Sequence, residues 1–353
     1  MNQQENGGGQ PHKRRVRYRG THPRSYQEKY KELQPEKYAD TVAHVIEKGG
    51  TPAGMHISIC VEEILSFLQI QPGQQGLDAT LGYGGHTLEM LKRLEGRGHL
   101  YALDVDTIEM AKTKSRLERL GYGPEILTIQ HRNFADIDQV AETAGLFDFV
   151  LADLGVSSMQ IDNPERGFSY KTEGPLDLRL DSSRGVTAAQ RLQEVSREEL
   201  IGMLEENSDE PYARQIASKV MQELKNGRPI ETTTRLREVI AAALAFLPAS
   251  EQAEQVKKSC QRTFQALRID VNSEFEVLYA FLEKLPGILK PGGRAAILTF
   301  HSGEDRLVKR SFKSLKQAGI YRDAAEDVIR PSAQECARNS RARSTKLRWA
   351  VRA

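Results

Sequence analysis

Short apolar runs and amphipathic segments alternate along the chain between residues 55 and 153. Each apolar run is long enough for one buried strand, and each amphipathic segment repeats its apolar positions at helical spacing. Strands that alternate with helices favour a parallel sheet covered by helices, with a ligand at the carboxyl ends of the strands. The predicted strands are 76–81, 98–104, 126–130 and 147–153, and the predicted helices are 57–68, 86–94 and 107–120.

This rhythm is interrupted in the second half of the chain. From about 165 to 285 the pattern is helical and no strand is evident. The strand pattern resumes after a turn at 290–293, with apolar runs at 294–300 and 345–352. We therefore predict an α/β domain that contains an inserted helical domain. The predicted parts are a basic, partly disordered N-terminal extension at 1–54, a first α/β part at 55–164, the helical insertion at 165–262 and a second α/β part with a basic C-terminus at 263–353.

Composition narrows the class of protein. Of the 353 residues, 39% are hydrophobic and 28% are charged, and no run of about 18 apolar residues is present. These features predict a globular cytoplasmic protein without membrane spans. The three cysteines, Cys60, Cys260 and Cys336, lie far apart in the sequence, so neither a disulfide framework nor a metal site is indicated.

The formal net charge of +2 conceals two basic ends. Segments 11–38 and 330–352 each carry a net charge of +6, which leaves about −10 for the rest of the chain. Contacts from Lys and Arg to phosphates dominate affinity for nucleic acids, so this distribution indicates a polyanionic partner. A solvated tail without a partner is the alternative for the first segment.

A glycine loop, Gly-Tyr-Gly-Gly, follows the first predicted strand at 82–85. Such a loop lets the backbone approach a ligand, and the N-terminus of the next helix favours negative charge. Thr87 stands where a dinucleotide fingerprint requires glycine, which disfavours nicotinamide and flavin cofactors. Asp104 ends the second strand 20 residues after Gly84, where a carboxylate can accept hydrogen bonds from both ribose hydroxyls. We expect a nucleoside ligand; a plain turn and a strand-end cap are the alternatives.

Two further side chains fit the same pocket. Phe134 follows the third strand and can lie against an adenine ring, although an aromatic residue there is as often part of the core. Asp153 ends the apolar fourth strand, where a carboxylate is destabilising unless it is solvated or hydrogen-bonded. A role for Asp153 in the site is therefore favoured.

Several long motifs are specific enough to indicate a family. They include LDATLGYGGHT, DLGVSSMQIDNPERGFSYKTEGPLDLRLD, TFQALRIDVNSE and LKPGGRAAILTFHSGEDRLVKR. With these motifs the chain, from about residue 55 to its end, resembles the bacterial ribosomal RNA small-subunit methyltransferase H family. The resemblance implies a class I, Rossmann-like fold with an inserted α-helical domain and S-adenosylmethionine as cofactor. It also implies methylation of N4 of a cytidine in the decoding region of 16S rRNA, as free RNA or in the small ribosomal subunit.

The same resemblance assigns the cofactor contacts, and it also shows positions at which this sequence differs from the family. Tyr83, Met159 and Gly303 stand where the family usually has arginine, proline and leucine, and typical members lack about 50 of the N-terminal residues. This extension is consistent with a paralogue that has another RNA target. The residues that the resemblance places at S-adenosylmethionine are Gly84, Gly85, His86, Asp104, Phe134, Asp153 and Gln160.

Methyl transfer from a sulfonium is an in-line displacement, for which the protein mainly positions the reactants and needs no metal. An acceptor for the N4–H of cytosine localises the nitrogen lone pair and takes up developing positive charge. Asp153 is the candidate for this catalytic role, and cofactor contact is its competing role. His301 is the candidate for orienting the base, although Ser302 with Asp305 also fits a helix-capping box.

The target base must leave any stack to reach such a pocket, so the RNA should be single-stranded, looped or flipped there. Ordinary loop packing is the alternative for the candidates that follow the fourth strand. The residues expected to contact substrate RNA are Arg166, Phe168, Tyr170 and Arg179 beside the cofactor, and Arg341, Arg343 and Lys346 in the basic C-terminus.

Other functions remain open at this point. A methyltransferase for a different RNA is the alternative within enzymes, and a non-catalytic RNA-binding factor for ribosome assembly is the alternative outside them. A DNA N4-cytosine methyltransferase is disfavoured, because Asp-Leu-Gly-Val at 153–156 replaces the usual Pro-Pro-Tyr type of motif. The sequence leaves the oligomeric state undecided, with a homodimer among the options.

Overall fold

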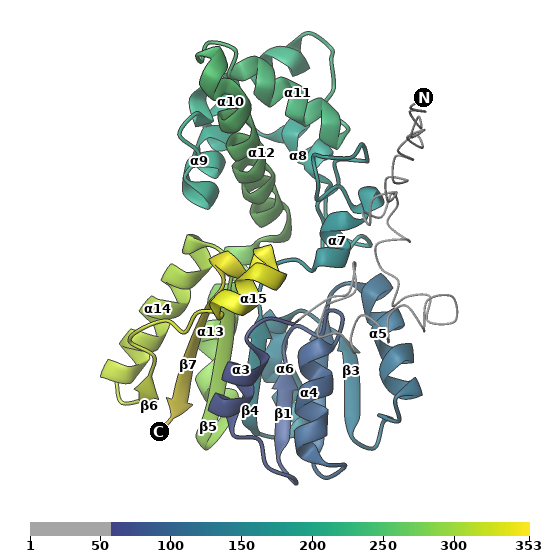
Figure 1. The fold of residues 1–353 in the computed structure, drawn as a ribbon, viewed down its shortest axis with the longest axis vertical. Coiled ribbons are helices and arrows are strands. Elements are labelled where there is room, and N and C mark those ends of the chain that lie inside the picture. Colours follow the sequence, from purple (N-terminus) through teal and green to yellow (C-terminus); the bar gives the residue numbers. More distant parts are fainter. Residues whose placement is uncertain (1–57) are drawn as a thin grey trace, which may run out of the picture. The chain divides into compact units, whose positions relative to one another are not determined.

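Residues 58–353 are described by a computed structural model (Figure 1), and the N-terminal extension predicted at 1–54 lies outside the described residues. The described part is built on one seven-stranded sheet with the strand order β3-β2-β1-β4-β5-β7-β6. Strands β1 to β5 run parallel, and β7 is antiparallel to both of its neighbours. The strands are β1 Gln75–Asp78, β2 His99–Asp104, β3 Leu127–His131, β4 Phe147–Asp153, β5 Leu289–Thr299, β6 Tyr321–Ala324 and β7 Lys346–Arg352.

Helices cover both faces of the sheet, which confirms the predicted Rossmann-like α/β class. In β4, Phe149 and Leu151 belong to an apolar cluster with α3, α4 and α5, whereas Val150 and Ala152 belong to a cluster with α6, α13 and α14. A strand buried on both faces has a continuous apolar sequence, as β4 has. These helices are α3 Val61–Leu68, α4 Gly85–Leu94, α5 Thr107–Arg119, α6 Ile137–Ala144, α13 Glu274–Ile288 and α14 Ser302–Gln317.

Between β4 and α13 the chain forms a group of helices with its own apolar core. That core is drawn from buried residues between Phe168 and Leu267. The long helix α12 runs from this group back toward the sheet (Figure 1), where Ser273, at a φ of 49°, separates it from α13. The helices are α7 Ser158–Asp162, α8 Ala188–Glu194, α9 Arg197–Ser208, α10 Ala213–Lys225, α11 Thr233–Ala243 and α12 Ala249–Asn272, and α15 Ala333–Arg338 lies near the C-terminus.

Two details of the sheet differ from the sequence-based expectation. The turn predicted at 290–293 is an irregularity inside β5, where the register jumps from Leu289 to Arg294 opposite β4. The four-residue edge strand β6 was not predicted, because it pairs only with β7 and has no apolar run of its own. Within residues 58–353 no helix is both long enough and apolar enough to span a membrane.

Candidate functional site

A cavity of about 800 Å³ opens at the carboxyl ends of the parallel strands. Its walls include the loops after β1, β2, β4 and β5, and the junction between α12 and α13. The strand order reverses direction between β1 and β4, and ligands of open α/β sheets bind in the crevice at that point. All seven residues predicted to contact the cofactor line this one cavity: Gly84, Gly85, His86, Asp104, Phe134, Asp153 and Gln160.

The glycine loop after β1 leaves no room for a side chain at Gly84 or Gly85. Gly84 has a φ of 74°, and a Cβ there would lie 2.7 Å from the methyl group of Thr113 on α5. A Cβ on Gly85 would overlap the Ser58 hydroxyl. Glycine at both positions therefore lets the loop pack between α5 and the segment before α3, and α4 begins at Gly85 on the cavity wall.

The buried carboxyl group of Asp78 holds this loop in place through hydrogen bonds. It accepts hydrogen bonds from the Thr87 hydroxyl at 2.6 Å and from the Thr80 backbone N–H at 3.1 Å. Burial raises the pKa of Asp78, an effect that its hydrogen bonds partly offset. Both ends of the loop are thus fixed to one side chain of β1.

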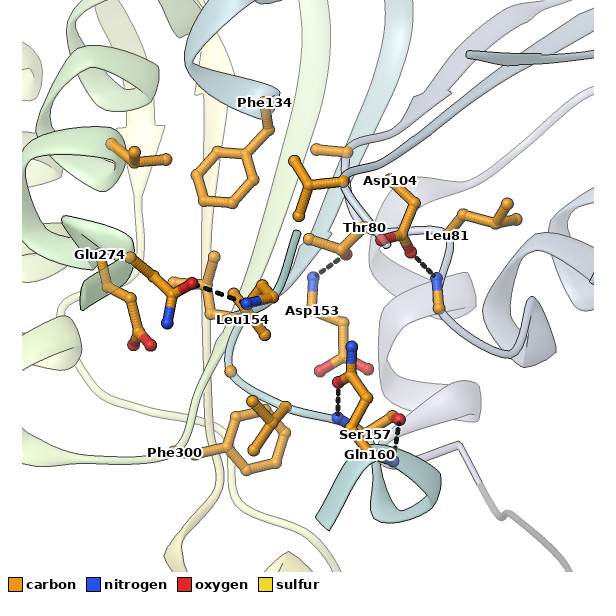
Figure 2. Close-up of a pocket in the computed structure, with 18 of the residues that line it drawn as sticks. Thr80, Leu81, Asp104, Phe134, Asp153, Leu154, Ser157, Gln160, Glu274 and Phe300 are labelled. Carbon is orange, nitrogen blue, oxygen red and sulfur yellow. Dashed lines mark hydrogen bonds between the residues drawn. The ribbon is translucent and has the colours of Figure 1, made fainter. Parts of the chain in front are cut away.

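Asp104 lies at the end of β2 with its carboxylate toward the loop (Figure 2). One oxygen accepts the Gly82 backbone N–H at 2.7 Å, and the other accepts the Asp106 backbone N–H at 2.8 Å. Burial raises the pKa of Asp104 to about 6 despite these bonds. Each carboxylate oxygen keeps a second lone pair, so Asp104 is oriented to accept two hydroxyl groups from the cavity.

Asp153 projects from the end of β4 into the middle of the cavity (Figure 2). Its backbone N–H donates to the Thr80 hydroxyl oxygen at 2.6 Å, and its Oδ2 lies 3.4 Å from Nδ1 of His86. The other nitrogen of His86 lies 2.9 Å from the Ile59 carbonyl oxygen. Burial alone would lower the pKa of His86, but the adjoining Asp153 carboxylate raises it above its usual value. The second oxygen, Oδ1, is buried and has no hydrogen-bond partner among the described residues.

Phe134 and Gln160 complete the same half of the cavity (Figure 2). Phe134 is half-buried, and its ring packs edge-to-face on Phe281 at a centroid distance of 5.3 Å. The Gln160 side chain accepts the Ser157 backbone N–H at 2.8 Å and donates to Asp106 Oδ2 at 2.8 Å. Phe134 therefore serves the core and the cavity together, and Gln160 holds the loop after β4 against the loop after β2.

The other half of the cavity lies over β5 and the α12–α13 junction. Arg268 donates from Nε and Nη2 to the two carboxylate oxygens of Glu274, at 2.7 and 2.8 Å. Nε2 of His301 lies 3.2 Å from Oε1 of Glu304, and Oε2 of Glu304 accepts the Phe300 backbone N–H at 2.8 Å. Burial would raise the pKa of Glu304, but His301 and the backbone N–H hold it below its usual value. The Arg268–Glu274 ion pair and the His301–Glu304 contact thus line this half.

The capping arrangement at α14 differs from the one considered from sequence. The helix begins at Ser302, so His301 is the N-cap residue and Glu304 is its partner. Asp305 instead pairs with Lys346 at 2.7 Å and Arg348 at 2.6 Å on β7. The interpretation of Ser302 with Asp305 as a capping box is therefore wrong by one residue in register.

Several residues predicted to contact RNA are placed elsewhere. Arg166 is 6% exposed, and its guanidinium donates to Asp106 at 2.6 Å and to the Leu180 carbonyl at 2.9 Å. Phe168 is buried in the core of the helical group, and Tyr170 packs edge-on against Phe264. A phosphate contact for Arg166 does not fit this burial, because its donors already bond within the protein.

The other RNA candidates differ in accessibility. Arg179 and Arg341 line the cavity while paired with Asp177 at 2.7 Å and Asp162 at 3.2 Å. Arg343 is exposed. Lys346 is half-buried in its pair with Asp305, so Arg343 is the most accessible of the C-terminal candidates.

Sequence reasoning did not identify Asp106, Arg268, Glu274 or Glu304. Arg268 and Glu274 lie in the motif TFQALRIDVNSE, which indicated the family without indicating a role. Their pairing across the helix junction is a tertiary feature. The sequence did contain one indication of a role for Arg268 and Glu274: both are ionisable residues in a segment that is otherwise helical and partly apolar.

Known proteins are similar to this chain over most of its length. The MraW methylase family matches residues 53–353. Ribosomal RNA small subunit methyltransferase H 1 of Lachnoclostridium phytofermentans is 69% identical over 342 residues, which cover 97% of this chain and 93% of that protein. The protein of the same name from Agathobacter rectalis is 66% identical over 97% of this chain and 98% of its own length. An rRNA methylase structure from Streptococcus thermophilus covers 84% of this chain and 99% of its own at 12% identity, with a TM-score of 0.39 that supports no conclusion.

Proposed function

Because the chain belongs to the MraW methylase family, we propose that it methylates the exocyclic N4 of a cytidine in the decoding region of 16S rRNA. Family membership makes it an S-adenosylmethionine-dependent methyltransferase of small-subunit ribosomal RNA. The observation that carries the finer proposal is the Asp153 carboxylate, whose side chain is 25% exposed and lines the cavity that contains the glycine loop and Asp104. A cytoplasmic location, where small ribosomal subunits are found, belongs to the same proposal.

The residues around the glycine loop fit the nucleoside part of the cofactor. Gly84 and Gly85 bring backbone to the cavity wall, Asp104 presents two oriented acceptors, and Phe134 offers an aromatic surface. These features are what an adenine ring and a ribose diol require. When bound, S-adenosylmethionine supplies an electrophilic methyl group.

Asp153 activates the nucleophile, N4 of the target cytosine. The lone pair of cytosine N4 is delocalised into the ring, so N4 is a weak nucleophile. The Asp153 carboxylate accepts one N4–H, which localises the lone pair and stabilises the positive charge that develops on nitrogen, and it takes up that proton as N4 gains the methyl group. His86, with Nδ1 at 3.4 Å from Oδ2, fixes the orientation of the carboxylate. His301, in the half of the cavity over β5, remains our candidate for orienting the base.

Cofactor affinity should depend on pH through Asp104. Because its pKa is raised to about 6, Asp104 is ionised at pH 7.5 and becomes protonated as the pH falls below 6, losing acceptor capacity toward the ribose. We expect Kd for S-adenosylhomocysteine, measured by calorimetry, to rise by up to about tenfold per pH unit below 6. Asp104→Asn should bind more weakly and lose this pH dependence. An unchanged Kd for the parent protein between pH 7.5 and 5 would contradict the role.

The exposed C-terminal cation Arg343 should contribute to RNA affinity. We expect Arg343→Gln to weaken RNA binding about three- to tenfold at low salt and to reduce the slope of log Kd against log salt by about 0.7. Filter binding across a salt series measures both. Lys92→Gln, which neutralises an exposed cation on α4 with 53% side-chain exposure, is the matched control. Equal slopes for both variants and the parent would contradict the contact.

A methyltransferase for another RNA is the second candidate. It was suggested by the N-terminal extension, but relatives named for the small subunit align with 97% of this chain and so share most of that segment. Labelled methyl transfer to small subunits, free 16S rRNA and other RNAs, followed by nucleoside analysis, separates the candidates. We expect N4-methylcytidine in 16S rRNA. Label confined to another RNA would support the alternative, and cofactor binding without transfer to any RNA would support a non-catalytic assembly factor.

A further inference from the structure

The half of the cavity over β5 contains a guanidinium group that is held from one side only. Nε and Nη2 of Arg268 donate to the two oxygens of Glu274, and Nη1 makes no hydrogen bond to any described residue. The side chains of Arg268 and Glu274 are 13% and 12% exposed, and both residues line the cavity. The end of the guanidinium therefore retains two parallel N–H donors, one on Nη1 and one on Nη2.

These donors share the cavity with the Asp153 acceptor. Asp153 lies between the Asp104 region and the region of Glu274 and Phe300 (Figure 2). If the cofactor occupies the part with the glycine loop and Asp104, the remaining part takes the acceptor base. That part offers one carboxylate acceptor, a pair of parallel donors and apolar walls from Val277, Leu278 and Phe300.

This donor and acceptor pattern matches one pyrimidine. Cytosine presents an N4–H donor followed by the N3 and O2 acceptors along one edge. Uracil presents an O4 acceptor and an N3–H donor at the first two positions. In this cavity O4 would face the Asp153 acceptor, and N3–H would face an Arg268 donor. A mismatch that leaves buried polar groups unpaired is strongly disfavoured.

We propose that Arg268, positioned by Glu274, is a specificity-determining residue that donates to N3 and O2 of the target cytosine while Asp153 accepts from N4. This inference rests on the proposed function and assigns its base selectivity. Glu274 is a positioning residue, because its bidentate bond sets the plane and direction of the guanidinium.

A divalent cation is a different interpretation of the same region. Glu274, His301 and Glu304 place ligand atoms within 4.8 Å of one another. Both oxygens of Glu274, however, already accept from Arg268, and Glu304 accepts the Phe300 backbone N–H. A fixed guanidinium beside the cluster repels a second cation, which favours base recognition over metal binding.

The test compares RNAs that differ only at the mapped target position. The parent protein with S-adenosylhomocysteine is titrated with single-stranded decoding-region RNA carrying cytidine, uridine or 3-deazacytidine, which lacks the N3 acceptor. We expect cytidine RNA to bind about 10- to 100-fold more tightly than uridine RNA, with 3-deazacytidine between them. Equal affinity for the three RNAs overturns the proposal without any variant having to fold.

Variants assign the selectivity to the guanidinium. Arg268→Lys keeps the charge but loses the fork, and we expect its preference for cytidine over uridine or 3-deazacytidine to fall to within about threefold. Glu274→Gln should raise KM for RNA more than it lowers kcat and should retain part of the preference. An S-adenosylhomocysteine Kd within about twofold of the parent value confirms that each variant is folded. If Arg268→Lys keeps full selectivity, the assignment is wrong.

The outcomes also separate this inference from the proposed function. A parent protein that forms no N4-methylcytidine in any RNA contradicts the proposed function. A parent protein that forms it but binds the three RNAs equally contradicts only the role of Arg268. Loss of RNA binding after EDTA treatment, restored by Mg²⁺ or Zn²⁺ alone, would instead support the cation and overturn the proposal.

Discussion

Asp153→Asn is expected to lower turnover by about 100- to 1,000-fold while the Kd for RNA stays within about threefold of the parent value. The amide preserves the shape of the side chain, and its NH₂ group can donate to Nδ1 of His86, whose pKa falls once the adjacent negative charge is gone. The amide oxygen can still accept from N4 but cannot neutralise the charge that develops there. The loss therefore falls on kcat.

Single-turnover methyl transfer and RNA titration measure the two quantities separately. Asp148→Asn is the matched control, because Asp148 lies on the same strand, contacts Lys290 and the Gln75 backbone N–H, and does not line the cavity. We expect near-parental turnover for this control. Equal losses of turnover and RNA affinity in Asp153→Asn would show that Asp153 acts only through binding.

Arg166→Leu is expected to destabilise the protein by about 3–5 kcal/mol. The side chains of Arg166 and Asp106 are 7% and 2% exposed, and removing the cation leaves the Asp106 carboxylate buried without its charged partner. Gln160 still donates to that carboxylate but carries no charge. This loss is a large part of the free energy of unfolding of a typical domain.

Urea denaturation measures the change, and Arg97→Leu provides the comparison. Arg97 pairs with Glu95 at the surface, with side-chain exposures of 68% and 65%, so its loss should change stability by less than about 1 kcal/mol. If Arg166→Leu keeps its stability but loses RNA affinity, the sequence-based prediction that Arg166 contacts RNA phosphate is correct.

The sheet could be predicted because its signals are local. The apolar runs of β1 to β4, the glycine loop and the carboxylates of Asp104 and Asp153 all lie within a single strand or its following turn. Parallel strands bring their carboxyl ends to one edge, so strand order alone places these residues around one cavity. Their individual roles at the cofactor stay predictions.

The features that sequence reasoning missed depend on contacts between distant segments. Arg166 was predicted to contact RNA because it lies in a polar motif. Its burial is explained only by its contact with Asp106, 60 residues earlier in the sequence. The α14 cap depends on where the helix begins, which periodicity does not define within one residue. The pairing of Arg268 with Glu274 requires the break at Ser273 that turns one helix into two.

The most direct test of the account is a structure of the protein with S-adenosylhomocysteine and a decoding-region RNA that contains the target cytidine. We expect N4 of the cytosine to lie within about 2.7–3.2 Å of a carboxylate oxygen of Asp153 and to face the cofactor sulfur. A complex in which Asp153 contacts only the cofactor, with N4 bonded elsewhere, would contradict the proposed chemistry.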